Sequence, residues 1–163
     1  MDLAQESIMT RNNEAEMITG AEADRSWTVL LVEDNPDDDM QARRVLEKAR
    51  RIGDVVSCRD AHMLFDQINN KHLNKDTLTS ARTIILLDIH LPGIDGMVLL
   101  EQLKTSPLTE NIPIIILTGD EDLDRVYQAY KKHANAFVLK PLQEHHLKDI
   151  YTVFDKGSNW KEK

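Results

Sequence analysis

The sequence lacks several features that would assign it to common classes of protein. It has one cysteine, Cys58, in 163 residues, which excludes an internal disulfide framework and suits a reducing compartment. No apolar run approaches the roughly 20 residues needed to span a bilayer, and residues 1–25 lack the apolar core of a signal peptide. The formal net charge of -8 argues against a nucleic-acid binder. We therefore expect a cytoplasmic protein that binds neither membranes nor nucleic acid.

Internal repeats and low-complexity tracts are also absent from the sequence. Hydrophobic residues make up 41% of the chain, which is enough for one domain with a core of ordinary size. Residues 1–26 are acidic and polar, and we expect a disordered leader there. The periodic segments occupy residues 27–154, and residues 155–163 form a polar tail. The sequence thus predicts one domain at 27–154, with no room for a second domain after it.

Apolar segments alternate with amphipathic segments throughout the predicted domain. The uninterrupted aliphatic run at residues 84–87 is typical of a strand buried on both faces. We expect strands at residues 27–32, 55–58, 84–88, 112–117 and 136–139, helices at residues 37–51, 61–70, 97–104, 121–133 and 144–154, and a long polar loop at residues 71–81. This alternation predicts an α/β fold, with a doubly wound five-stranded parallel sheet and right-handed crossovers.

Polar side chains stand at the end of four of these strands. Glu33 and Asp34 follow the first strand, Asp88 ends the third, Thr118 follows the fourth and Lys140 follows the fifth. Because the carboxyl ends of parallel strands meet at one edge, we expect these residues to converge. Clustered carboxylates repel one another, so the cluster needs a cation, and oxygen ligands suit Mg²⁺. With a lysine and a hydroxyl donor, these groups could accept a phosphoryl group on a carboxylate.

Four motifs at these strand ends resemble the receiver domains of response regulators in two-component signalling. They are Leu31–Asn35, Leu87–Gly96, Leu117–Gly119 and Leu139–Pro141. The resemblance covers roughly residues 27–154 and implies a (βα)5 flavodoxin-like fold with strand order 2-1-3-4-5. It also implies a function: the chain accepts a phosphoryl group from a histidine kinase and signals through protein contacts, without DNA-binding output and without being an enzyme.

The resemblance assigns a role to each residue that matches the family's motifs. Asp88 matches the phosphoryl acceptor. Glu33 and Asp34 match the acidic pair that holds Mg²⁺, with Asp34 and Asp88 as direct ligands, and His90 matches the position whose backbone carbonyl is a further ligand.

Four more positions match the part of the family's site that holds and senses the phosphoryl group. Thr118 and Lys140 match the residues that hold the phosphoryl oxygens. Phe137 matches the aromatic switch that turns inward when Thr118 moves, and it replaces the tyrosine that is common there. Gly119 matches a position that is kept small for access.

Within the family, the chain is most similar to stand-alone regulators of bacterial phytochrome kinases. The segments Glu33–Asp38, Leu117–Asp122 and Ala134–Phe137 carry this resemblance, which implies a bacteriophytochrome as the kinase. Tyr127 and Tyr130 leave an apolar face on the fourth helix. We expect a homodimer through the fourth helix, the fifth strand and the fifth helix.

Three alternative functions remain at this point. A relay intermediate would pass the phosphoryl group on to another histidine protein, and the residues do not exclude it. A Mg²⁺-dependent phosphatase with Asp88 as nucleophile would usually carry an acid two residues later, where this chain has His90. A flavin-binding module would need a loop of Gly, Ser and Thr after the first strand, whereas Glu33–Asp37 would repel a phosphate.

Overall fold

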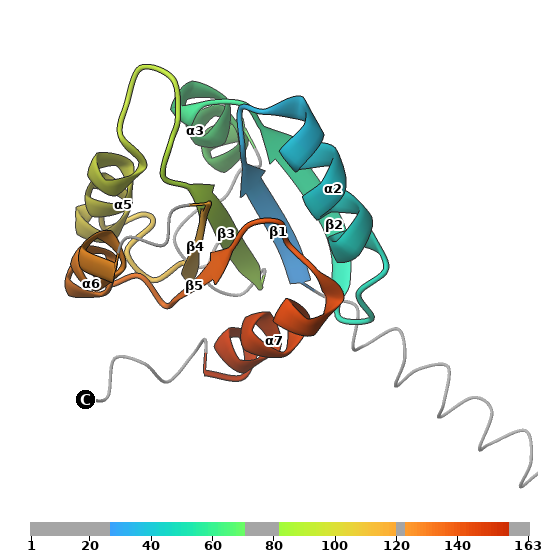
Figure 1. Ribbon diagram of the computed structural model, residues 1–163. Helices are drawn as coiled ribbons and strands as arrows, with labels where there is room; N and C mark the ends of the chain where they lie inside the picture. Colours follow the sequence, from blue (N-terminus) through green and yellow to red (C-terminus); the bar gives the residue numbers. More distant parts are fainter. Residues whose placement is uncertain (1–26, 71–81, 120–122, 157–163) are drawn as a thin grey trace, which may run out of the picture.

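Five parallel strands form one sheet, with helices packed on both faces (Figure 1). The computed structural model describes residues 27–70, 82–119 and 123–156. The strands are β1 (Trp27–Val32), β2 (Ile52–Cys58), β3 (Thr83–Asp88), β4 (Ile114–Thr118) and β5 (Ala136–Leu139). Their order, β2-β1-β3-β4-β5, places β3 at the centre and confirms the predicted topology. No helix in these described ranges is long and apolar enough to cross a membrane.

The helices form two layers, one on each face of the sheet. One layer contains α2 (Pro36–Glu47) and α7 (Leu147–Lys156), and the other contains α3 (Ala61–Asn70), α5 (Gly96–Thr105) and α6 (Leu123–Lys131) (Figure 1). Alternation along β1 divides its side chains, so that Leu31 packs in the layer of α2 and Leu30 packs in the layer of α3. Every residue of β3 is buried. Full burial of a leucine or isoleucine contributes roughly 1.5–3 kcal/mol, so this strand anchors both layers.

Two predicted boundaries near the first crossover are wrong. The first helix ends at Glu47 instead of residue 51, because Lys48 caps it and donates its backbone N–H to the carbonyl of Leu46. Strand β2 begins at Ile52 instead of residue 55. Gly53 lies inside this strand at an irregularity, where the partners of β1 shift from Ile52 to Asp54. Glycine there permits a bulge and does not end the strand.

The elements of the second half differ from the prediction in smaller ways. Strand β4 begins at Ile114 because Pro113 has no N–H to give to the ladder, although the Pro113 carbonyl accepts from Ile85 N at 2.9 Å. The last helix begins as a single 3₁₀ turn, η1 (Glu144–His146), and continues as α7 to Lys156. The predicted leader, the loop at residues 71–81 and the start of the fourth helix at residues 121–122 lie outside the described residues.

Aromatic stacking joins the first strand to the last helix. The rings of Trp27 and Phe154 lie 4.1 Å apart and nearly parallel, at 6°. Arg51 lies over the Phe154 ring at 5.5 Å and pairs with Asp155 at 2.8 Å. The start of β1 is therefore held against the end of α7, and these contacts lie at the sheet edge opposite the strand carboxyl ends.

Candidate functional site

Asp88 ends the central strand and is held in place by the loop that follows it. The residue is 3% exposed, and its Oδ1 accepts a hydrogen bond from His90 N at 3.0 Å. The loop turns at Gly93, whose φ of 78° favours glycine, and returns where Gly96 N donates to Ile89 O at 2.8 Å. Asp88 thus has a fixed orientation at the sheet edge, with Oδ2 left to face other groups.

The β1–α2 loop places a second buried carboxylate opposite Asp88. Glu33 is 2% exposed, and its Oε1 accepts from Asn35 N at 3.0 Å. The side chain of Asn35 caps α2 by accepting from the backbone N–H groups of Asp37 and Asp38 at 2.9 and 3.2 Å. Pro36 occupies the first turn, where its missing N–H costs nothing. Helix α2 therefore begins at Pro36, shortly after β1, and its acidic first turn lies above the strand ends.

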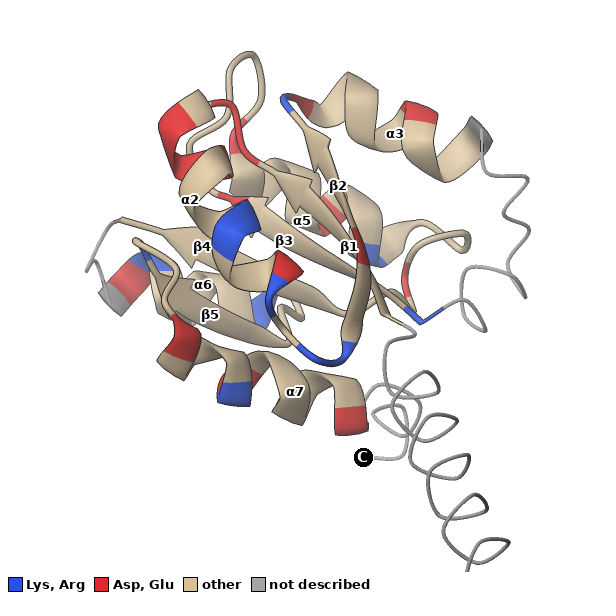
Figure 2. Cartoon of the chain, turned by 90° about the vertical axis from the view of Figure 1, so that its right-hand side faces the viewer, with Lys and Arg blue, Asp and Glu red and all other residues tan. Residues whose placement is uncertain are grey.

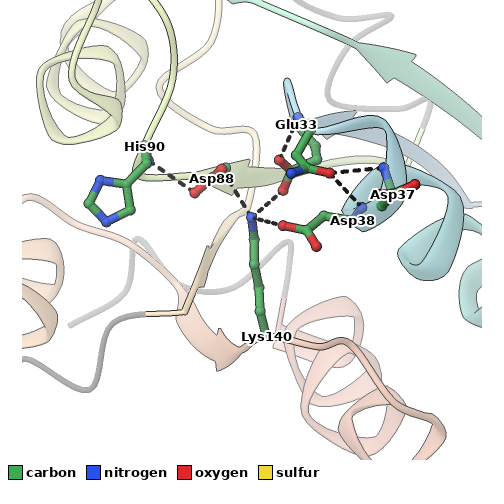
Figure 3. Close-up of polar contacts among 7 residues, drawn as sticks. Glu33, Asp37, Asp38, Asp88, His90 and Lys140 are labelled. Atoms are coloured by element: carbon green, nitrogen blue, oxygen red, sulfur yellow. Dashed lines mark hydrogen bonds and ion pairs between the residues drawn. The ribbon is translucent and has the colours of Figure 1, made fainter.

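Lys140 joins the acidic groups into one cluster (Figure 3). It follows β5, where its backbone N–H donates to Thr118 O at 2.8 Å. Its Nζ lies 3.0 Å from Asp88 Oδ2 and 3.1 Å from Asp38 Oδ2, and it also pairs with Glu33 Oε2. One ammonium group therefore contacts three carboxylates that come from β3, α2 and the β1–α2 loop.

Burial and charge act in opposite directions on this cluster. Burial raises the pKa of Glu33, and the nearby charge of Asp88 adds to the increase, although the hydrogen bond from Lys140 opposes it. Burial alone would lower the pKa of Lys140, but its hydrogen bonds to Glu33, Asp88 and Asp38 together raise it. Lys140 is consequently a permanent positive charge, whereas the site still contains more carboxylates than cations.

Three carboxylates in the cluster lie close enough together that they could hold a metal ion. Glu33, Asp34 and Asp88 each offer an oxygen, and these oxygens lie within 4.8 Å of one another. Asp34 is exposed, so a cation could reach it from solvent. A hollow of about 330 Å³ opens here between the strand ends and the β1–α2 loop, and its lining includes Glu33, Asp34, Asp38, Asp88 and Lys140. Hard oxygen donors and space for bound water fit Mg²⁺.

Of the remaining predicted site residues, His90 and Gly119 line this hollow, whereas Thr118 and Phe137 do not. Thr118 ends β4 and is buried, and its carbonyl accepts from Lys140 N at 2.8 Å. The side chain of His90 is exposed and directed away from Lys140 (Figure 3), so only its backbone takes part in the site. A Cβ on Gly119 would meet no atom within 4 Å, which leaves the rim of the hollow open. Phe137 is half-buried on β5 and contacts Tyr130.

Two ion pairs between distant segments of the chain were not predicted from the sequence. Asp38 is not among the predicted site residues, yet its Oδ2 lies 3.1 Å from Lys140 Nζ. Asp95 caps α5 by accepting from Met97 N at 2.7 Å, and its other oxygen pairs with Arg125 of α6 at 2.9 Å. The acidic first turn of α2, visible in Figure 2, was the only signal that Asp38 could face the strand ends.

The topology and the sheet edge together define the class of flavodoxin-like receiver domains. An acidic pair after β1, an aspartate at the end of β3 and a lysine after β5 meet at one edge. The model of the response regulator receiver domain matches residues 29–152, and the chain belongs to this family.

Relatives with similar lengths support this assignment. The chain is 33% identical over 127 residues to the probable methanogenesis regulatory protein FilR2 of Methanothrix harundinacea, covering 78% of this chain and 80% of that protein. It is 31% identical over 127 residues to the response regulator Rcp1 of Synechocystis, covering 77% of this chain and 82% of Rcp1. The solved structure of the bacteriophytochrome response regulator AtBRR matches with 29% identity and a TM-score of 0.63, covering 78% of this chain and 91% of that chain.

Proposed function

We propose that this receiver domain accepts a phosphoryl group on Asp88 from a histidine kinase, with Mg²⁺ bound by Glu33, Asp34 and Asp88. The observation that carries the proposal is the contact between Lys140 Nζ and Asp88 Oδ2 at 3.0 Å, inside an acidic cluster. A related structure, that of Rcp1, is described as bound to Mn²⁺, which supports a divalent cation at this edge.

The residues of the chain suit each part of the transfer. A carboxylate oxygen of Asp88 forms a bond to phosphorus while the phosphorus–nitrogen bond of the kinase phosphohistidine breaks, and the imidazole leaves with that electron pair. Lys140 and the Thr118 hydroxyl hold phosphoryl oxygens. A bound Mg²⁺ would neutralise charge on the same oxygens. The backbone N–H of His90 keeps Asp88 oriented during the transfer.

The signal would leave through protein contacts made by the described domain. We propose a homodimer through α6, β5 and α7, because Tyr127 and Tyr130 on α6 are 57% and 47% exposed, and Leu139 on β5 is 37% exposed. A bacteriophytochrome is the proposed kinase, since AtBRR is a bacteriophytochrome response regulator. The proposed compartment is the cytoplasm, where such a kinase domain would lie.

Labelling with a small phosphoryl donor tests the acceptor. The wild-type protein, incubated with acetyl phosphate and Mg²⁺, should gain the mass of one phosphoryl group, and Asp88→Asn should gain none. Asp54→Asn, which removes an exposed acid of β2, is the matched control and should be labelled like the wild type. Equal labelling of Asp88→Asn and the wild type would show that the acceptor lies elsewhere.

A further inference from the structure

Asp38 is the partner of Lys140 that the proposed reaction does not use. Its Oδ2 lies 3.1 Å from Lys140 Nζ, and it projects from the first turn of α2, in the layer that packs on one face of the sheet (Figure 3). The Asp38 side chain is 42% exposed, whereas that of Lys140 is only 17% exposed. The contact therefore joins a buried ammonium to a carboxylate at the rim of the hollow.

The ammonium group of Lys140 already has three acidic partners in this arrangement. An ammonium group has three N–H donors, and Lys140 Nζ contacts three carboxylates, those of Glu33, Asp38 and Asp88. A phosphoryl oxygen that accepts from Lys140 would compete with these carboxylates for the N–H groups of the lysine. The carboxylate that gives up its contact with Lys140 determines the free-energy cost of forming the phosphorylated state.

The three carboxylates differ in what a bound cation would do to them. Glu33 and Asp88 belong to the group whose oxygens lie within 4.8 Å, so a cation there would offset their charge and weaken their attraction for Lys140. Asp38 is outside that group. It also has a backbone anchor, because its N–H donates to Asn35 Oδ1 at 3.2 Å, which keeps it beside Lys140.

We propose that Asp38 is a positioning residue that competes with the phosphoryl group for Lys140 and thereby favours the unphosphorylated state. The inference rests on the proposed function of Asp88 and adds a residue that sets the balance between the two states. When the phosphoryl group takes the lysine, Asp38 is released at the rim between α2 and the segment that follows β5, where Lys140, Pro141 and Leu142 line a second, smaller hollow with it.

Binding of beryllofluoride, a mimic of the phosphoryl group, tests the competition at equilibrium. With saturating Mg²⁺, the dissociation constant measured by ¹⁹F NMR should fall about two- to fivefold in Asp38→Asn and in Asp38→Ala, as expected when a half-exposed ion pair is lost. The phosphoryl group gained from acetyl phosphate should also be lost more slowly in both variants. Asp38→Glu keeps the charge and should restore the wild-type constant.

Asp37→Asn is the matched control, because it removes the same charge from the same helical turn. The backbone N–H of Asp37 also donates to Asn35, and the residue is exposed. The dissociation constant of Asp37→Asn for beryllofluoride should stay at the wild-type value. Equal tightening in Asp37→Asn would overturn the proposal, since it would show a general charge effect. Weaker binding in Asp38→Asn would also overturn it, because Asp38 would then hold Lys140 in a productive position.

The same measurements separate this inference from the proposed function. A wild-type protein that binds no beryllofluoride and takes no label from acetyl phosphate would contradict the function itself. The wild-type protein could instead bind beryllofluoride and be labelled by acetyl phosphate, while Asp38→Asn has the wild-type dissociation constant. That result would contradict only the competition by Asp38.

Discussion

Tyr130 of α6 meets Phe137 of β5 edge to face, with ring centroids 5.9 Å apart and an interplanar angle of 85°. Phe137 is half-buried against the core that α3, α5 and α6 share, whereas Tyr130 is exposed. Such an edge-to-face pair contributes about 0.5–1.5 kcal/mol. A rotation of Phe137 would break this contact, so a change at β5 would remove a support of the exposed Tyr130 ring on α6.

The first prediction concerns the dimer that this surface is proposed to form. Tyr127→Ala combined with Tyr130→Ala should weaken self-association, because it removes the two largest exposed side chains of α6. Analytical ultracentrifugation with and without beryllofluoride would measure the dimer constant, and the mimic should change it by roughly 5–150-fold in the wild type. Met63→Ala, on α3, is the control and should leave the constant unchanged. A wild-type protein that stays monomeric in every condition would rule out the dimer.

The second prediction concerns stabilisation by Mg²⁺. A cation that binds only the folded chain stabilises it by mass action, by about 2.7 kcal/mol at 100 times its Kd. The Tm of the wild type should therefore rise by several degrees in Mg²⁺, because the ion also relieves repulsion among Glu33, Asp34 and Asp88. Asp34→Asn should lose most of this increase, whereas Asp54→Asn should keep it. A Tm of the wild type that is indifferent to millimolar Mg²⁺ would count against the site.

The third prediction concerns the close packing behind Asp88. A Cβ at Gly96 would lie 2.4 Å from the backbone oxygen of Asp88 and 2.6 Å from Ile89 Cα. Gly96→Ala should therefore lower the free energy of unfolding, by about 1–3 kcal/mol, as overpacking does. Gly119→Ala meets nothing within 4 Å and should change it by less than about 0.5 kcal/mol. Urea unfolding measures both variants, and equal stability of the two would show that the α5 turn can move away from β3.

The fourth prediction concerns Lys104, which joins α5 to the connections that precede β4 and β5. Its Nζ donates to Ile112 O at 2.7 Å and to Asn135 Oδ1 at 3.2 Å, and Asn135 Oδ1 also accepts from Ile114 N at 2.8 Å. Burial lowers the pKa of Lys104 to about 7. A neutral amine keeps two N–H donors, so both of these contacts survive deprotonation.

The sign of the pH dependence follows from this lowered pKa. Between about pH 7 and pH 10, the unfolded chain binds more protons at Lys104 than the folded chain does, so stability should rise with pH in that window. Urea unfolding at several pH values should show this increase in the wild type and in Lys148→Met, an exposed control, but not in Lys104→Met. Parallel curves for the wild type and Lys104→Met would assign the titration to another group.

The sheet and its polar edge could be predicted from the sequence because both depend on local patterns. The aliphatic run at residues 84–87 specifies a buried strand, and the alternation with helical segments makes the sheet parallel. Asp88 ends its strand, and Glu33 and Lys140 directly follow theirs, so the converging strand ends bring the three residues together. The start of β2 was predicted wrongly for a physical reason. Glycine, here Gly53, ends a strand in one context and permits a bulge in another.

Contacts between distant residues could not be predicted in the same way. Asp38 and Lys140 are 102 positions apart, and their contact depends on how far the first turn of α2 reaches over the sheet edge. The Asp95–Arg125 pair depends likewise on how α6 lies against the loop after β3. Helix position on a sheet is set by the packing of many side chains, which no short motif encodes.

The stacking of Trp27 on Phe154 has a consequence for protein engineering. Trp27 and Phe154 lie near the two ends of the described residues 27–156, and their rings are in contact. These residues could therefore be inserted into one surface loop of a host protein, with the two junctions close together. The acidic edge with Asp88 would then face away from the host. The domain is thus suited to insertion into a host protein in a way that leaves its acidic edge accessible.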